Sequence, residues 1–256
     1  MALTTIGLMA LLGCFTGFMA GLLGIGGGMI ITPFLIMLIP SSLIPHEHIV
    51  HVAIATSLAT IAFTSLSSVR AHHKRGAVLW NVVASVAPGI LVGAVVGAQI
   101  AGWLPTFWLS LIFAAFVGFS AFKMFLNKSP RPDRNLPGTI GKFFMGIAIG
   151  ILSALVGAGG GFISVPWMIW CNVKMQNAVA TSAAFGFPIA LFGTIGYIIS
   201  GWNVSGLPPW PIDLGYICIP ALFSVAITSV LFAPLGAKVA HSIAVSYTHQ
   251  TLPTIA

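Results

Sequence analysis

Two glycine clusters form a repeated motif and are the residues best suited to bind a ligand. The first copy runs from Gly24 to Gly28 (Gly-Ile-Gly-Gly-Gly) and is followed by Pro33; the second runs from Gly157 to Gly161 and is followed by Pro166. A helix that restarts after such glycines presents unpaired backbone N–H groups and the positive end of its dipole, which attract an anion. Successive glycines also allow the turns of an anion-binding nest. The motif therefore predicts two anion-binding helix starts.

Hydroxyl side chains near the motif are candidates to complete such a site. Thr56-Ser57 and Thr181-Ser182 each follow an alanine, and Thr32 and Ser164 lie inside the motif copies. Hydroxyls donate hydrogen bonds to the oxygens of a small oxyanion. We predict the following substrate-binding residues: Gly26, Gly27, Gly28, Thr32, Thr56, Ser57, Gly159, Gly160, Gly161, Ser164, Thr181 and Ser182.

A purely structural interpretation of the same residues stays open. Glycine runs permit tight helix packing in membranes, and Ser and Thr often bond carbonyls of their own helix. Pro33 and Pro166 are predicted helix-break residues that contact no substrate. We expect neither an enzyme nor a metal or cofactor site, because no apolar segment offers a nucleophile–base pair, clustered metal ligands or a cofactor motif.

Histidines gather at both ends of the predicted helix 49–69. The cluster at the start of this helix comprises His46, Glu47, His48 and His51. It fits a solvated loop, a proton-coupling or pH-sensing group, or, less well, a metal site, since the spacing matches no clear zinc pattern. His72 and His73 lie in a basic stretch and are expected to contact lipid headgroups.

Composition excludes a soluble domain. The chain is 58% hydrophobic and 5% charged, with mean hydropathy +1.06 over 256 residues, and its apolar runs suit membrane helices. The runs are continuous, whereas a β-barrel needs short alternating segments. The net charge of +7 lies between the runs, which indicates lipid headgroups as partners and argues against nucleic acid. Cys14, Cys171 and Cys218 show no metal-ligand spacing.

The sequence thus predicts an all-α polytopic membrane protein made of two repeats. The first repeat covers 1–126, a basic linker covers 127–141 and the second repeat covers 142–245. Residues 241–256 are too short and polar to span, so a last helix is expected to be missing, with 246–256 a non-native tail. The expected apolar segments are 4–23, 29–40, 49–69, 77–101, 105–126, 142–157, 162–171, 177–200 and 214–236.

Loop charges indicate that the two repeats are inverted. The loop around 70–75 and the linker are basic, which places both in the cytoplasm and the N-terminus outside. Corresponding loops carry opposite bias, because Lys174 follows 162–171 whereas no cation follows 29–40. Segments 29–40 and 162–171 are too short to span, so each repeat is predicted to be a glycine-tipped re-entrant hairpin plus three spans. Interfacial anchors are expected at Trp103, Trp108, Trp202 and Trp210.

The paired glycine motifs, the Ala-Thr-Ser elements and the basic stretch from His72 to Gly76 resemble the sulfite exporter TauE/SafE family of permeases. The resemblance implies a secondary transporter for a small anion, often an oxidised sulfur compound, in the bacterial inner membrane. The implied partners are the anion, the bilayer and a coupling proton or sodium ion, with a homodimer possible. A channel-like anion pore and a structural or assembly subunit remain the alternatives.

Overall fold

The computed structural model describes residues 3–24, 26–40, 44–125, 135–204, 207–208 and 212–250, and these ranges are almost entirely helical. The predicted all-α class is confirmed, apart from one short antiparallel hairpin of β1 (Asp213–Leu214) and β2 (Ile217–Cys218). The helices are α1 (Leu3–Leu23), α2 (Gly28–Leu38), α3 (Ile49–His73), α4 (Trp80–Trp103), α5 (Thr106–Phe125), α6 (Thr139–Val156), α7 (Gly161–Trp170), α8 (Met175–Gly201) and α9 (Ile219–Gln250).

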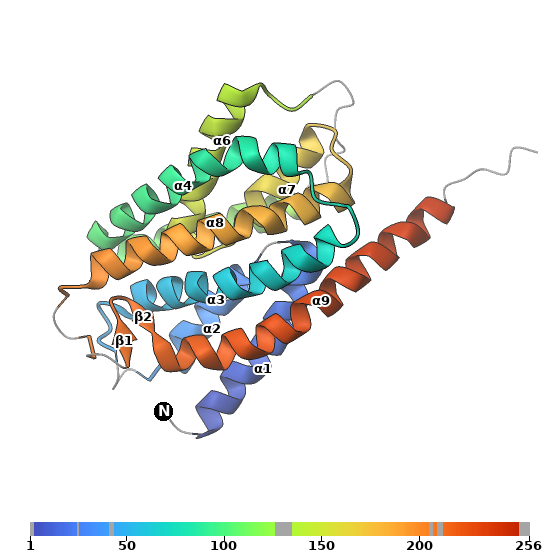
Figure 1. The fold of residues 1–256 in the computed structure, drawn as a ribbon. Coiled ribbons are helices and arrows are strands. Elements are labelled where there is room, and N and C mark those ends of the chain that lie inside the picture. The colour runs from blue at the N-terminus through green and yellow to red at the C-terminus, as the bar shows by residue number, and fades with distance from the viewer. Residues whose placement is uncertain are drawn as a thin grey trace, which may run out of the picture.

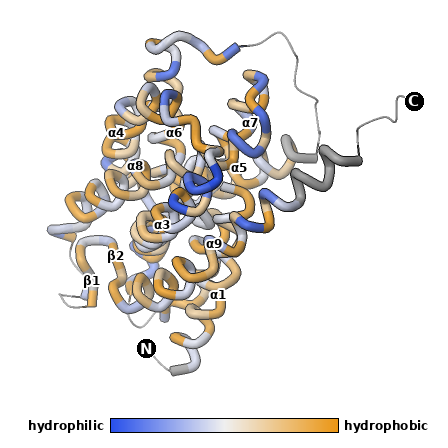
Figure 2. Tube along the Cα trace, turned by 45° about the vertical axis from the view of Figure 1, so that its right-hand side comes forward, coloured by the Kyte–Doolittle hydropathy of each residue, from blue (hydrophilic) through white to orange (hydrophobic). Residues whose placement is uncertain are grey.

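Six of the described helices have the length and hydropathy to cross a membrane, namely α1, α3, α4, α6, α8 and α9. The helices are apolar along their length, and hydrophilic stretches lie toward their ends (Figure 2). Helices α2 and α7 have only 11 and 10 residues, as the sequence predicted. The chain is therefore a polytopic membrane protein.

Some predicted boundaries are wrong. Helix α9 begins at Ile219 rather than at 214, because Gly215 has a φ of 60° and turns the chain between β1 and β2. The same helix continues to Gln250, well past the predicted end at 236. Helix α6 begins at Thr139, inside the predicted linker 127–141. Most of that linker, and residues 251–256 of the predicted tail, lie outside the described residues.

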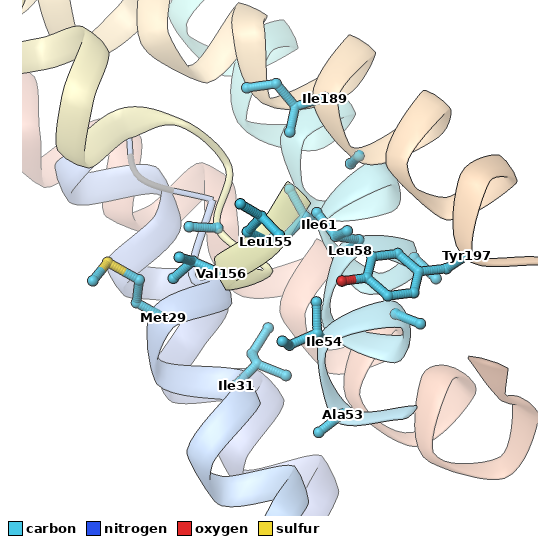
Figure 3. Packing of buried hydrophobic residues seen from close by; sticks show 14 of the residues in the cluster. Met29, Ile31, Ala53, Ile54, Leu58, Ile61, Leu155, Val156, Ile189 and Tyr197 are labelled. Atoms are coloured by element: carbon cyan, nitrogen blue, oxygen red, sulfur yellow. The ribbon is translucent and has the colours of Figure 1, made fainter. Parts of the chain in front are cut away.

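The helices form a bundle around α3, whose span is 83% buried. Helices α1 and α9 pack along one side, α4 and α6 along the other, and α3 and α8 lie between them (Figure 1). Helices α3 and α8 are antiparallel, since Gly186 lies beside Ser65 and Gly193 beside Leu58. Ile54, Leu58 and Ile61 of α3 pack in one cluster with the end of α6 and the start of α2 (Figure 3).

Glycine ridges bring the outer helix pairs into close contact. Gly13, Gly17 and Gly21 recur every four residues on α1 and face α9, while Gly89, Gly93 and Gly97 do the same on α4 against α6. A Cβ atom on Gly17 would lie 2.3 Å from the carbonyl oxygen of Ser229. Without a hydrophobic force between helices in lipid, such close backbone contact is a main source of association. Neither ridge was predicted from the sequence.

These ridges predict a stability difference between glycines of one helix. Gly17→Ala should lower the melting temperature in detergent by several degrees, because overpacking a tight contact costs about 1–3 kcal/mol. Gly7→Ala is the matched control, since nothing lies within 4 Å of its added Cβ atom. Equal melting temperatures for the two variants would contradict the close α1–α9 contact.

Candidate functional site

The two glycine clusters break the chain with matching backbone geometry at their first and fourth residues. Gly24 and Gly157, which follow α1 and α6, have φ angles of 67° and 66°. Gly27 and Gly160, which precede α2 and α7, have φ and ψ of 76° and −10° and of 77° and −11°. Side chains strongly disfavour this left-handed region, so glycine is required at both ends of each break. The repeat seen in the sequence is therefore also a repeat of backbone conformation at these two positions, whereas Gly26 has a φ of 74° and its counterpart Gly159 has no positive φ.

The prolines do not make these breaks. Pro33 and Pro166 lie inside α2 and α7, and both helices continue past them. A proline inside a helix removes one hydrogen bond of the ladder and can kink or break the helix, but α2 and α7 do not end at these residues. The prediction of Pro33 and Pro166 as helix-break residues is corrected accordingly.

The structure brings the two breaks together in the protein interior. A Cβ atom on Gly26 would lie 2.9 Å from Cα of Gly159, and one on Gly28 would lie 2.0 Å from the carbonyl oxygen of Gly157. Every described residue of both breaks is buried. No side chain caps the start of α2 or α7. Ile30 and Ile163 already donate to the carbonyl oxygens of Gly27 and Gly160 at 3.1 Å, whereas the N–H groups before them have no acceptor within their own helix. Two sets of backbone donors therefore lie close together, away from solvent.

Two serines bond the breaks to the opposite half of the chain. Ser57 of α3 donates to the carbonyl oxygen of Gly157 at 3.1 Å and lies 3.3 Å from that of Gly28. Ser182 of α8 donates to the carbonyl oxygen of Gly24 at 2.9 Å. Each serine thus reaches the first glycine of the break in the other repeat.

Two threonines make a second matched pair of contacts. The Thr56 hydroxyl accepts the N–H of Cys218, just before α9, at 3.0 Å. The Thr181 hydroxyl accepts the N–H of Leu79, just before α4, also at 3.0 Å. Both threonines therefore help to start a long helix of the opposite repeat, which is a structural role.

A third matched pair of hydrogen bonds joins a buried aromatic side chain on one helix to a backbone carbonyl near the end of another helix. His72 Nε2 donates to the carbonyl oxygen of Gly21 at 3.1 Å, and the Tyr197 hydroxyl donates to that of Ala154 at 3.1 Å. The two rings occupy corresponding positions of α3 and α8, and their acceptors lie three residues before Gly24 and Gly157. The expectation that His72 contacts lipid headgroups is wrong, because it is 1% exposed. His73 is exposed.

The remaining predicted hydroxyls differ in their partners. Ser164 donates to the carbonyl oxygen of Gly160 at 2.9 Å and lies 2.8 Å from Ser182 Oγ. Thr32 Oγ1 is buried without a partner among the described residues. Of the six predicted hydroxyls, Thr32 is therefore the one whose hydrogen-bonding capacity the protein leaves unused.

Ser153 is a second unpartnered hydroxyl at the same break, and the sequence analysis missed it. In the described part of the chain, the buried side-chain atoms without a partner are Thr32 Oγ1, Ser153 Oγ, His48 Nδ1, Ser68 Oγ and Thr194 Oγ1. A Cβ atom on Gly157 would lie 3.0 Å from Thr32 Oγ1, and one on Gly160 would lie 3.4 Å from Ser153 Oγ. Both hydroxyls therefore flank the break between α6 and α7.

This pair departs from the internal repeat. The motif alignment places Val165 opposite Thr32 and Ala20 opposite Ser153, so the first repeat has apolar side chains there. An unpaired buried hydroxyl costs about 1–3 kcal/mol. The Ala20–Ser153 difference was visible in the aligned sequences and is the signal by which Ser153 could have been found.

The histidine cluster at the start of α3 is only partly solvated. His46 and Glu47 are exposed, as a solvated loop predicts. His51 is 3% exposed, directs Nε2 at the carbonyl oxygens of Ala101 and Leu104, at 3.1 and 3.0 Å, and stacks on Tyr216. Burial raises the pKa of the Tyr216 phenol, which keeps it neutral. The described residues contain no group of three histidine, cysteine or acidic side chains placed to hold a metal ion.

Three of the predicted tryptophan anchors are exposed on the surface. The exposed fractions of Trp103, Trp108 and Trp202 are 83%, 53% and 65%, as expected for rings at a membrane interface. Trp210 lies outside the described residues.

The fold and the paired breaks define a polytopic membrane protein with a repeated glycine break. The sulfite exporter TauE/SafE family matches residues 9–252. A probable membrane transporter protein of Haemophilus influenzae is 34% identical over 95% of this chain and 92% of its own length. A second, of Bacillus subtilis, is 30% identical over 73% of this chain and 76% of its own length. No solved structure matches significantly. The chain therefore belongs to the sulfite exporter TauE/SafE family, as the resemblance indicated.

The hydrogen bonds of Ser57 and Ser182 to the carbonyls of the opposite break predict that both serines stabilise the fold. Ser57→Ala and Ser182→Ala should each lower the melting temperature by several degrees, because each leaves a buried carbonyl unpaired at a cost of about 1–3 kcal/mol. Ser85→Ala is the control, since the Ser85 hydroxyl bonds the carbonyl of Asn81 in its own helix. Variants of Ser57 and Ser182 that melt with the control would contradict this role.

Proposed function

We propose that the protein is a secondary transporter that moves a small oxidised sulfur anion, such as sulfite, thiosulfate or a sulfonate, across the inner membrane by alternating access. The observation that carries the proposal is the pair of unpartnered hydroxyls, Thr32 and Ser153, beside the break that starts α7. The family and the transporter names of the relatives support the same class of function.

In this proposal the anion binds at the second break. Backbone N–H groups in the first turn of α7 face its oxygens, and Thr32 and Ser153 add hydroxyl donors. The helix dipole favours negative charge at this point, and neutral donors hold an anion without a buried cation. Neutral donors also suit transport, because an ion pair in low dielectric would release its partner slowly. Ser57, Ser164 and Ser182 hold the breaks in shape, since their hydroxyls donate to glycine carbonyls.

We further propose that the two repeats cross the membrane in opposite directions. The antiparallel course of the corresponding helices α3 and α8 supports this orientation, as does the charge bias of the loops. Because all described residues of the breaks are buried, substrate entry requires the bundle to open. The His72–Gly21 and Tyr197–Ala154 contacts are candidates to break in turn, one toward each side of the membrane.

Flux into proteoliposomes tests the transport proposal. The unmodified protein should show saturable sulfite or thiosulfate uptake that is accelerated by substrate on the opposite side. Thr32→Val and Ser153→Ala should reduce apparent affinity about tenfold each, the effect of losing one hydrogen bond to a charged group. Neither should lower the melting temperature, because neither removes a bond within the protein.

Ser224→Ala is the control for this experiment, since the Ser224 hydroxyl bonds the carbonyl of Pro220 in its own helix. Normal affinity in both Thr32→Val and Ser153→Ala would show that the site is elsewhere. Flux that never saturates and shows no acceleration would identify an anion pore instead of a transporter.

Cysteine labelling tests the orientation. In a cysteine-free background, His46→Cys and Lys174→Cys mark corresponding loops of the two repeats, and both positions are exposed. A membrane-impermeant maleimide should label His46→Cys only from outside and Lys174→Cys only from the cytoplasm. Labelling of both from one side would contradict the inverted arrangement.

A further inference from the structure

A cationic hollow lies between α3 and α9, away from the glycine breaks. It is an open depression of about 410 Å³, lined by Ser67, Arg70, Ala71, Lys74, Arg75 and Pro234. Arg70, Lys74 and Arg75 are exposed, and no carboxylate is among the lining residues. The hollow therefore presents three positive charges that no lining side chain neutralises.

The hydrogen bond that joins α3 to α9 at the base of the hollow depends on one proline. Pro234 has no N–H, so the carbonyl of Val230, one turn earlier in α9, loses its helical partner. Ser67 of α3 donates to that carbonyl oxygen at 2.8 Å. Arg75 in turn donates from Nη1 to the carbonyl oxygen of Ala71 at 3.0 Å, which holds its guanidinium on the end of α3.

The cations are not part of the duplicated scaffold. In α8 the positions that correspond to Ser67, Arg70, Lys74 and Arg75 are Phe192, Ile195, Ile199 and Ser200. The repeat thus preserves the hydrogen bonds around the breaks in both halves but places this charge at one end only. A favourable helix dipole explains cations at the end of α3, but it does not explain why they surround a hollow.

A line of buried hydroxyls joins the hollow to the glycine breaks. Thr64 lies on α3 about one turn before Ser67, toward the glycine breaks. Its hydroxyl is 2.7 Å from Ser229 Oγ of α9. Thr60 follows one turn further, and Ser57 at the breaks comes next. Thr60, Thr64 and Ser229 are all fully buried. Thr60 and Thr64 donate to the carbonyl oxygens of Thr56 and Thr60 in α3, so α3 carries buried hydroxyls between the hollow and the breaks, and one of them pairs with α9.

We propose that this hollow is a second anion site, which binds the oxyanion on the side of the membrane where α3 ends before it passes along the α3–α9 seam to the breaks. This inference rests on the proposed transport function. A concave cluster of like charge raises the local concentration of an oppositely charged ligand and its rate of association. The ligand chemistry, a small oxyanion, is shared by a free substrate and by a lipid phosphate.

Transport kinetics in neutral phosphatidylcholine vesicles test the free-anion proposal. Arg70→Gln, Lys74→Gln and Arg75→Gln, combined, should raise the KM for sulfite about tenfold when it is supplied at the face with the hollow, with Vmax within about twofold. Substrate supplied at the opposite face should keep its KM. The charge-retaining set Arg70→Lys and Arg75→Lys should keep the parent KM, which assigns the effect to charge, and the retained Vmax of the triple variant shows that it folds.

Lys142→Gln, at the start of α6, removes one cation outside the hollow and serves as the control for a cation lost elsewhere. Equal KM values for the triple variant and the control would overturn the proposal. A KM effect that occurs only when phosphatidylglycerol is added to the vesicles would assign the hollow to lipid headgroups and would also overturn it. Absence of saturable flux in the unmodified protein would instead contradict the proposed function itself.

Discussion

Unpaired backbone groups are expensive inside a membrane, and this constraint shapes the whole bundle. Each glycine break releases N–H and C=O groups where no water is present to bond them. The carbonyls are satisfied from the opposite repeat, by Ser57 at Gly157 and by Ser182 at Gly24. The N–H groups at the starts of α2 and α7 receive no side-chain cap. The protein's own hydroxyls thus bond the released carbonyl groups, and N–H groups are left as donors where the proposed anion binds.

This arrangement makes the two repeats dependent on each other. Helix α1 packs on α9 and α4 on α6, each through glycine ridges that cross from one repeat to the other. Thr56 and Thr181 each accept an N–H just before a long helix of the other repeat. The features that differ between the repeats include the hydroxyls of Thr32 and Ser153, and the cations at the end of α3. Those are the features to which we assign ligand binding.

Much of this architecture could be predicted from the sequence, because its signals are local. Glycine runs inside apolar segments identified the breaks, and segment length identified α2 and α7 as short helices. The burial of His72 could not be foreseen, since a histidine beside Lys74 and Arg75 has the pattern of a loop; the acceptor at Gly21 exists only once α1 packs against α3. The start of α9 was misplaced because the β1–β2 turn at Gly215 lies within an apolar run.

The sequence indicated which hydroxyls lie near the breaks, but it did not indicate which groups they bond. All six predicted hydroxyls are buried in the structure, yet at least three of them donate to glycine carbonyls and two others accept backbone N–H groups. Which hydroxyl stays free depends on distances between repeats, and no spacing within one helix contains that information. Ser153 was overlooked for a different reason: a lone serine in an apolar helix usually bonds its own backbone, so its mismatch with Ala20 in the aligned motifs drew no attention.

Anomalous diffraction from crystals soaked in selenite, a heavier analogue of sulfite, tests the central claim most directly. The selenium peak is predicted within hydrogen-bonding reach of the first-turn N–H groups of α7 and of the Thr32 and Ser153 hydroxyls, and it should vanish in Thr32→Val with Ser153→Ala combined. An ordered peak that lies elsewhere, and that persists in the double variant, would contradict the assignment of the glycine break as the anion site.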